Sequence, residues 1–521
     1  MTDNDGRRRQ RNRRHLLVRR WWAVAIGAVL VIVGSYVAWT TLQDGCGGGE
    51  KIWRTADPHR ECIGVSDGSE FFNDPDGKDA AARAIIERIN SVQEKITAEN
   101  EAVAQEPQYV KVVLLMPLTV SEEQPSAIPL NQIQHSLEGV YTAQRRINQS
   151  TVFGDPNAPK LQLLLANQGS RQDISSRFVE RVLEVSDTEH PLVGVIGLGS
   201  SVENTDELVE TLGSEEHKIP MVSAITSSDT LTGPPNFWSV SPSNVQYAQA
   251  IRSLLDQQGR GSLRSGLIVR DSNRDPYTRT LSDAFQAHLS PYVKFPELTY
   301  RGGTIEQPAT SRVFAPVVTN LCNAANSRQS PLDMVFYAGR VADFQGFAEA
   351  LEVRVCKNRP LAVLVGATGF ADAQRYEGTL RNGNVTVIYA SSSDPARWGR
   401  NGTGTPPDFA AFSDAFVRSG FDRADLVDGL AIAHHDAFAT IAMATRLAAQ
   451  GEDIPEPEDV ASQFNQLVLA YQVPAASGRL SFPSSARGRA VTRVIPLRQI
   501  GTSTPFLLPE DLEPYEVTAP R

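Results

Sequence analysis

Four turns carry the residues of this sequence that are best suited to hold a small polar molecule. Each follows a short apolar run, and three of them are rich in Gly, Ser and Thr and lead into a helical segment. The turns lie at residues 197–201, 223–228, 339–343 and 366–369. Backbone N–H groups and hydroxyls at helix N-termini form a favourable seat for a carboxylate or another oxyanion. Helix capping would explain any one turn alone, but the recurrence of such turns at corresponding strand ends favours a binding site.

A second cluster of residue types that can do chemistry is the run His434, His435 and Asp436. With the abundant serines it suggests a hydrolase, but the sequence contains no GxSxG elbow, HExxH motif or GxxxxGK[ST] loop. The three residues fall in the middle of a predicted helix, where packing and capping explain them better. Residues 197–201 also lack the lysine of a nucleotide site. We therefore expect a protein that is not an enzyme and that uses neither cofactor nor metal.

The chain contains four cysteines, at Cys46, Cys62, Cys322 and Cys356. An even number of cysteines in an oxidising compartment favours disulfides. Proximity in sequence pairs Cys46 with Cys62 and leaves Cys322 with Cys356. Zinc binding is the alternative, but the sequence has no CxxC pair or nearby histidine at a ligand spacing.

Residues 21–42 form an apolar segment without one charged side chain. About 20 helical residues, at a rise of about 1.5 Å each, cover the ~30 Å of bilayer hydrocarbon. We therefore predict one membrane-spanning helix. Aromatic residues lie at both of its ends and all eight arginines of residues 1–20 precede it, which places the N-terminus in the cytoplasm and the main domain outside it. A cleaved signal peptide is the alternative, although the apolar run is longer than the usual signal core.

Lipid attachment at Cys46 is disfavoured, because no aliphatic residue stands three places before it.

The charge distribution supports the predicted membrane topology. The chain has a formal net charge of −10, although residues 1–20 hold eight arginines against two aspartates. An acidic domain argues against a nucleic-acid partner, and a basic tail beside an apolar helix fits the inner face of a membrane. The tail is too short to be a signalling domain, so any signal must pass through a partner protein.

The region that follows the predicted membrane helix divides into two parts. Residues 43–77 are rich in Gly, Asp and Pro, have no sustained period and are expected to be a juxtamembrane linker. Residues 78–105 have apolar positions at helical spacing and are expected to form a stalk or capping helix within the segment 43–108. Its apolar stripe must pack on the main domain or on a second copy, so a homodimer through this helix is an alternative. The stripe comprises Ala81, Ile85, Ile89, Val92 and Ile96.

From residue 109 onwards, short apolar runs alternate with amphipathic segments. Such alternation predicts parallel, doubly wound sheets, and eight runs are too many for one small sheet. Most runs are continuously apolar, as expected of strands covered on both faces. Strands are predicted at 110–118, 160–167, 192–197, 219–224, 264–270, 333–339, 361–366 and 385–391. Helices are predicted near 131–148, 173–187, 203–214, 243–258, 275–289, 310–326, 341–355, 407–419, 427–449 and 456–470. In these sheets the ligand crevice lies outside the carboxyl ends of the strands.

Five stretches of this region, including VGVIGLGSS at 193–201, resemble one known family in their order and spacing. The others are residues 219–251, 267–285, 334–351 and 431–448, the last followed by 477–488. They resemble the type I periplasmic-binding-protein family, and within it the branched-chain amino-acid receptors of ABC transporters. The resemblance covers about residues 109–500. It implies two Rossmann-like α/β lobes, joined by three hinge strands, with a ligand between them. The implied first lobe is 109–241 plus 370–465, the second is 242–369 plus 466–500, and 501–521 is a C-terminal tail.

The resemblance also implies which residues bind the ligand. In the family, the loop and the turn that match 199–201 and 226–227 hold the α-carboxylate and the ammonium of the ligand. The corresponding residues are Ser200, Ser201, Thr226 and Ser227. Tyr277 matches an aromatic residue that lines the second-lobe face of the cleft.

Two departures from the family pattern bear on the ligand. Arg340 stands where the amino-acid binders often carry a tyrosine, and the acidic partner of the ammonium is replaced near Thr368. Burying an ammonium without a carboxylate is costly, and an arginine adds repulsion. The expected ligand is therefore anionic or neutral, with Asp343 and Asp372 as alternative partners for an ammonium.

The resemblance implies non-catalytic capture of a small molecule by closure of the two lobes, for uptake through an ABC permease. Two alternatives remain at this point. One is a membrane-anchored sensor that acts through a partner protein, and the other is a scaffold that keeps the fold without binding a ligand.

Overall fold

The computed structural model describes residues 46, 51–55, 60–121, 126, 128–155, 158–257, 263–303, 312–449, 454–501, 506–509 and 512–519. The predicted basic tail at 1–20 and the predicted membrane helix at 21–42 lie outside these residues. Within the described part of the chain, no helix is both long enough and apolar enough to cross a membrane.

The first lobe contains a seven-stranded sheet with the strand order β1-β2-β4-β3-β5-β6-β7. Strands β3 to β7 pair in parallel. Alternate residues of β3 supply two cores: Val112 and Leu114 share one with helices α2, α3 and α13, whereas Val113 and Leu115 share the other with α4 and α5. The strands are β3 (Tyr109–Met116), β4 (Lys160–Asn167), β5 (Leu192–Gly197), β6 (Met221–Ser223) and β7 (Phe237–Ser239). The helices are α2 (Ala80–Val103), α3 (Leu130–Gln149), α4 (Ser176–Leu183), α5 (Glu203–Leu212), α11 (Pro395–Trp398), α12 (Phe409–Arg418), α13 (Leu430–Ala448) and α14 (Pro457–Gln463).

The second lobe contains a six-stranded sheet with the order β16-β12-β11-β10-β8-β9. Its strands are parallel except β16, which is antiparallel to β12. Helices α6 and α7 cover one face of this sheet, and α8, α9 and α10 cover the other. The strands are β8 (Gly266–Asp271), β9 (Leu298–Tyr300), β10 (Met334–Ala338), β11 (Leu361–Gly366), β12 (Val385–Ala390) and β16 (Leu497–Ile500). The helices are α6 (Asn244–Gln257), α7 (Pro276–His288), α8 (Ala315–Ala325), α9 (Val341–Glu352) and α10 (Glu377–Asn382).

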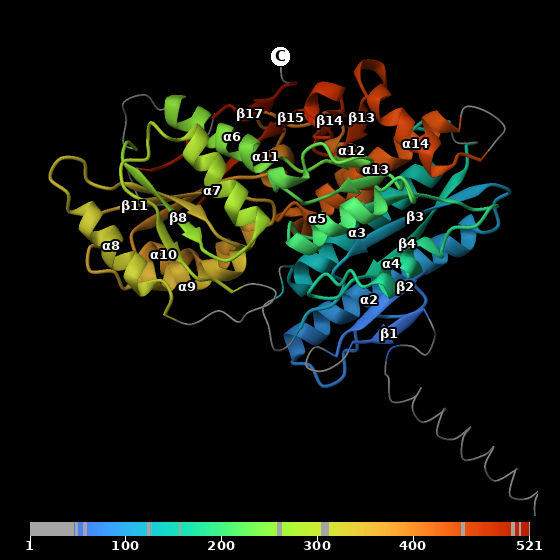
Figure 1. Ribbon diagram of the computed structural model, residues 1–521, viewed down its shortest axis with the longest axis horizontal. Helices are drawn as coiled ribbons and strands as arrows, with labels where there is room; N and C mark the ends of the chain where they lie inside the picture. Colours follow the sequence, from blue (N-terminus) through green and yellow to red (C-terminus); the bar gives the residue numbers. More distant parts are fainter. Residues whose placement is uncertain are drawn as a thin grey trace, which may run out of the picture.

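A small antiparallel sheet lies where the two lobes meet, on the side away from β1 and α2 (Figure 1). Leu480 packs in the core of the first lobe, whereas Val491 and Ile495 pack in a core of the second. The sheet is therefore fixed to both lobes. Its strands are β13 (Val473–Ala475), β14 (Gly478–Ser481), β15 (Val491–Ile495) and β17 (Tyr515–Val517).

All eight predicted strands are present, but the predicted lobe boundaries need correction. Residues 370–390 belong to the second lobe, because β12 pairs in parallel with β11 and α10 lies beside it. Of the predicted second-lobe segment 466–500, only β16 joins that lobe's sheet. The predicted tail 501–521 contributes β17 to the small sheet. The apolar pattern of a buried strand is the same in either sheet, so periodicity does not reveal which sheet the strand joins.

The region predicted to be a linker also differs. It contains β1 (Ile52–Arg54) and β2 (Cys62–Ser66), which pair antiparallel with each other at the edge of the first-lobe sheet, where β2 also pairs with β4. The predicted disulfides Cys46–Cys62 and Cys322–Cys356 are both formed. The first one attaches residue 46 directly to β2. The chain therefore enters the first lobe as part of its sheet.

Helix α2 caps its own lobe. Its apolar residues Ile89, Val92 and Ile96 are buried in the same core as the strands of the first sheet. The first lobe thus covers these three residues of the apolar stripe, as expected of a capping helix.

Asn100 fixes α2 to the sheet with all the hydrogen bonds that its amide can make. Its Oδ1 accepts from the Leu163 N–H at 3.0 Å and from Gln144 at 2.8 Å. Its Nδ2 donates to the carbonyls of Leu163, at 2.7 Å, and Asp67, at 2.9 Å. The side chain is buried, so each partner would lose its hydrogen bond without access to water.

We expect Asn100→Ala to lower the free energy of unfolding by roughly 2–4 kcal/mol, since it leaves several buried polar groups unpaired. The measurement is urea denaturation of the full chain in detergent micelles. Glu101→Ala, at the exposed neighbouring position on α2, is the control and should change stability little. Equal stability of the two variants would contradict this account of how α2 is held.

Candidate functional site

A cavity of about 70 Å³ lies between the lobes, at the carboxyl ends of strands from both sheets. This is the position where open α/β sheets bind ligands. Six of the seven predicted binding residues line it, and Thr226 does not. The first lobe contributes Ile128, Gln132, Ser200, Ser201, Ile225, Ser227 and Leu430, and the second contributes Tyr277, Arg340, Val341, Ala367 and Thr368. Ile128, Gln132 and Leu430 lie outside the four predicted turns, and nothing in their local sequence pattern marks them.

The backbone amides expected to seat a carboxylate already have partners within the first lobe. The Ser200 N–H donates to Gln172 Oε1 at 2.8 Å, and Gln172 Nε2 donates back to the Ser200 carbonyl at 3.0 Å. The Ser201 hydroxyl oxygen accepts from the N–H groups of Ser227, at 3.1 Å, and Ser228, at 3.2 Å. Gln172 and the Ser201 hydroxyl therefore pair with backbone donors on which the prediction relied.

Thr226 does not line the cavity but stabilises the turn next to it. It is fully buried, its N–H donates to Ser223 Oγ at 3.0 Å, and its hydroxyl contacts the same atom. Its carbonyl accepts from the buried Arg489 at 2.8 Å. These bonds shape the turn that carries Ser227, whose side chain reaches the cavity.

Arg340 is the main polar residue on the second-lobe side. It precedes α9, and its Nε and Nη2 donate to the two oxygens of Asp275 at 2.5 and 3.1 Å. Nη2 also crosses the cleft and donates to the Ser201 carbonyl at 2.7 Å. Burial acts to lower the pKa of Arg340, but Asp275 more than offsets it, so the pKa lies above its ordinary value. The guanidinium is charged and already neutralised by its partner.

The two remaining second-lobe residues make hydrogen bonds within the walls of the cavity. The Tyr277 hydroxyl donates to the Gly366 carbonyl at 3.1 Å, and burial raises its pKa, so it stays protonated. The Thr368 hydroxyl is 2.8 Å from the Tyr247 hydroxyl.

Neither of the two alternative acidic residues lines the cavity. Asp343 accepts from the Gly303 N–H at 2.8 Å, and burial together with the nearby Asp271 raises its pKa to about 7. Asp372 accepts from Asn131 at 3.0 Å and from Gln132 at 2.9 Å. Because these two donors belong to the first lobe, Asp372 helps to hold the lobes together.

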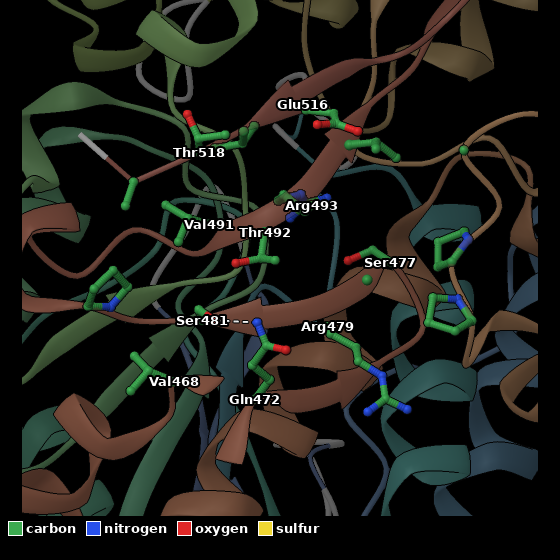
Figure 2. Close-up of a pocket in the computed structure, with 18 of the residues that line it drawn as sticks. Val468, Gln472, Ser477, Arg479, Ser481, Val491, Thr492, Arg493, Glu516 and Thr518 are labelled. Atoms are coloured by element: carbon green, nitrogen blue, oxygen red, sulfur yellow. Dashed lines mark hydrogen bonds between the residues drawn. The ribbon is translucent and has the colours of Figure 1, made fainter. Parts of the chain in front are cut away.

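A larger groove of about 690 Å³ lies on the open face of the small sheet, away from the cleft. Figure 2 shows Gln472 directed towards Ser481, to which it donates at 2.8 Å, with Arg479 and Glu516 at separate edges. Arg479 lies 3.3 Å from Asp408. The polar side chains of this groove do not converge on one point, so the smaller interlobe cavity is the better candidate site.

The run His434, His435 and Asp436 is buried in α13 and holds the small sheet in place. His435 lies between Arg146, at 2.6 Å, and Asp436, at 2.8 Å. Asp436 also accepts from the N–H groups of Ala476 and Ser477 at 2.7 and 2.9 Å. These contacts join α13 to the turn between β13 and β14. In the described residues, no group of three His, Cys, Asp or Glu side chains is arranged to hold a metal ion.

No protein-family model and no curated protein sequence matches the chain. Solved structures do match. A leucine-binding protein from Thermotoga maritima is 15% identical, with a TM-score of 0.54, over 76% of this chain and 96% of that one. An ABC-transporter solute-binding protein from Rhodopseudomonas palustris, in complex with 4-hydroxybenzoate, is 16% identical, with a TM-score of 0.56, over 79% and 98%. A branched-chain amino-acid ABC-transporter protein from Thermus thermophilus, with bound valine, is 13% identical, with a TM-score of 0.54, over 79% and 97%. The chain has the type I periplasmic-binding-protein fold that its sequence predicts.

The two neighbouring serines of the first-lobe loop should differ in their effect on stability. Ser201→Ala leaves the buried amides of Ser227 and Ser228 without their acceptor, so we expect a loss of roughly 1–3 kcal/mol. Ser200→Ala removes a hydroxyl from the cavity wall and should cost much less. Urea denaturation of both variants tests this, and equal losses would contradict the assigned hydrogen bonds.

Buried histidines should make the stability depend on pH. Burial lowers the pKa of His434 to about 4, whereas an unfolded histidine titrates near ~6.5. Between these values the unfolded chain binds the additional proton, so stability falls as the pH is lowered through this window.

We expect His434→Leu to reduce this loss, measured as the melting temperature at about pH 7 and about pH 5. The His434 Nε2 atom is buried without a hydrogen bond, so an apolar replacement should fold. Met443→Leu, on the same helix, should retain the wild-type pH dependence. A wild-type pH dependence in His434→Leu would contradict the assignment.

Proposed function

We propose that this protein is a membrane-anchored, extracytoplasmic solute-binding protein that captures a small amino-acid-like or anionic organic molecule for ABC-type uptake. The observation that carries the proposal is the interlobe cavity, formed where the strands of both sheets end and lined by six predicted binding residues. Solved structures of similar fold hold leucine, valine and 4-hydroxybenzoate. The anchor in this proposal is the apolar segment 21–42, with the basic tail on the cytoplasmic side.

Capture requires the lobes to part. Pockets for small ligands usually measure about 300–1,000 Å³, so a cavity of about 70 Å³ is too small for an amino acid. The arrangement of the lobes is a closed one. A ligand enters only if the hydrogen bond between Arg340 and the Ser201 carbonyl breaks. The ligand then shifts the balance between the open and the closed arrangement of the lobes to the extent that it binds one of them better.

The charges in the cleft favour a ligand that is neutral overall. Arg340 is paired with both oxygens of Asp275, so it offers no uncompensated positive charge to an anion. The N–H groups of Ser200, Ser227 and Ser228 are paired within the first lobe. Among the proposed ligands, a neutral or zwitterionic molecule therefore fits better than an organic anion, which would have to separate Arg340 from Asp275.

A second candidate function is that of a sensor or non-binding scaffold that acts through a membrane signalling partner. One observation favours it: the N–H groups of Ser200 and Ser227, which were expected to hold a ligand, are paired with Gln172 and Ser201, and Arg340 closes the cleft from the other side. A domain that closes by itself can present a constant surface to a partner. Ligand binding separates the two candidates.

The test is a screen of neutral amino acids, aromatic acids, organic acids and short peptides against the full chain in detergent. We expect at least one of these compounds to raise the melting temperature by a few degrees. Ala367→Leu places a larger side chain in the cavity wall and should abolish the shift. Ala342→Leu, at an exposed position of α9, should retain it. If no compound shifts the melting temperature of the folded protein, uptake is refuted and the scaffold is favoured.

A further inference from the structure

The groups around Arg340 bind its guanidinium through Nε and Nη2. The carboxylate of Asp275 engages it through both oxygens, at 2.5 and 3.1 Å, which is the strongest geometry available to this cation. The Ser201 carbonyl accepts a further N–H at 2.7 Å. The Tyr277 ring lies 5.5 Å from the guanidinium carbon, within the range of a cation–π contact.

These partners come from both lobes. Asp275 caps the N-terminus of α7 by accepting from the Tyr277 N–H at 2.9 Å, so its carboxylate is held firmly in the second lobe. Ser201 belongs to the first lobe, where its hydroxyl holds the amides of Ser227 and Ser228. The guanidinium therefore joins the two lobes through its bond to the Ser201 carbonyl, beside the hydrogen bonds that Ser228 donates to the Pro276 carbonyl and Gln132 donates to Asp372.

The guanidinium also takes the place that a ligand would need. Arg340 and Ser201 both line the interlobe cavity, and the relative exposure of the Arg340 side chain is 12% against 4% for Asp275. A side chain tethered next to its own site has a high effective concentration there. A free molecule must therefore compete with a permanent occupant.

We propose that Arg340 is a tethered occupant of the ligand cleft, that its guanidinium holds the lobes closed without any free ligand, and that the seat it fills is selective for guanidinium cations. The inference rests on the proposed function only in placing the ligand in the same cavity. A ligand enters the cleft by displacing Arg340 from the Ser201 carbonyl. A molecule that carries its own guanidinium or amidinium group is matched to every contact that Arg340 vacates.

The test is chemical rescue of Arg340→Ala in the full chain in detergent micelles. The lobe separation is measured by spin-label distances between Glu94→Cys on α2 and Glu349→Cys on α9, which are exposed positions of different lobes (Figure 1). The native cysteines are paired in disulfides and do not take the label. We expect a short distance for the parent protein without ligand and a longer one for Arg340→Ala, with a lower melting temperature.

Millimolar methylguanidinium should restore the short distance and at least half of the lost melting temperature in Arg340→Ala. N-methylurea, which has a similar shape but no charge, should restore neither. Arg381→Ala removes an exposed arginine of the same lobe and should behave as the parent protein in every measurement.

A second variant keeps the test decisive if Arg340→Ala is poorly folded. Asp275→Asn combined with Arg340→Ala retains an oxygen for the helix cap and removes the unpaired buried charge. It should open the lobes and should not respond to methylguanidinium. The proposal is overturned if the variants remain closed, if methylguanidinium has no effect on Arg340→Ala, or if N-methylurea works equally well. Because lobe separation is measured without a solute ligand, these results do not depend on the outcome of the ligand screen.

Discussion

The guanidinium of Arg340 lies between the Asp275 carboxylate and the Ser201 carbonyl, and this ion pair makes a charged contact between the two lobes at the cavity. A charge removed from water needs both an opposite charge and hydrogen bonds, since otherwise its desolvation exceeds the Coulombic gain. Asp275 provides the first through two hydrogen bonds, and the first lobe provides the remaining acceptor. Separating the lobes therefore exposes a carbonyl and a paired cation at once. Asp372 adds to the same closure by accepting from Asn131 and Gln132.

The first-lobe loop shows how a fold can be kept while the chemistry of its site changes. A turn at the end of a strand leaves N–H groups that must be paired if they are buried. In this protein Gln172 and the Ser201 hydroxyl pair with them. The loop is thus stable without an anion, and its remaining polar contact with the other lobe is an acceptor that takes a cation. The Ser-rich sequence of the loop suggests a site for an anion, whereas the Ser201 carbonyl accepts a hydrogen bond from a cation.

The N-terminal region connects the proposed anchor closely to the first lobe. The predicted membrane segment ends at Leu42, and Cys46 is bonded to Cys62 at the start of β2. Strand β2 pairs with β4, and α2 covers the adjacent core through Ile89, Val92 and Asn100. The small sheet that joins the lobes lies on the opposite side of the molecule (Figure 1). In a membrane-anchored protein, the first lobe would be the fixed one, and the second lobe would move on the small sheet.

The sequence by itself determined the central strands, the main helices, both disulfides and six of the residues around the cavity. The strands, helices and disulfides follow from local apolar periodicity and from cysteine spacing, whereas the cavity residues were implied by the resemblance to the periplasmic-binding-protein family. Only the tertiary structure placed β12 in the second lobe and β1, β2 and β17 in sheets, because a short strand is stabilised by partners that are distant in sequence. It also decided that Thr226 lies behind the site and that Arg340 is neutralised by Asp275. Hydrogen-bond partners such as Asp275, Gln172 and Arg489 are defined by distance in space, and the spacing of residues along the chain contains no information about that distance.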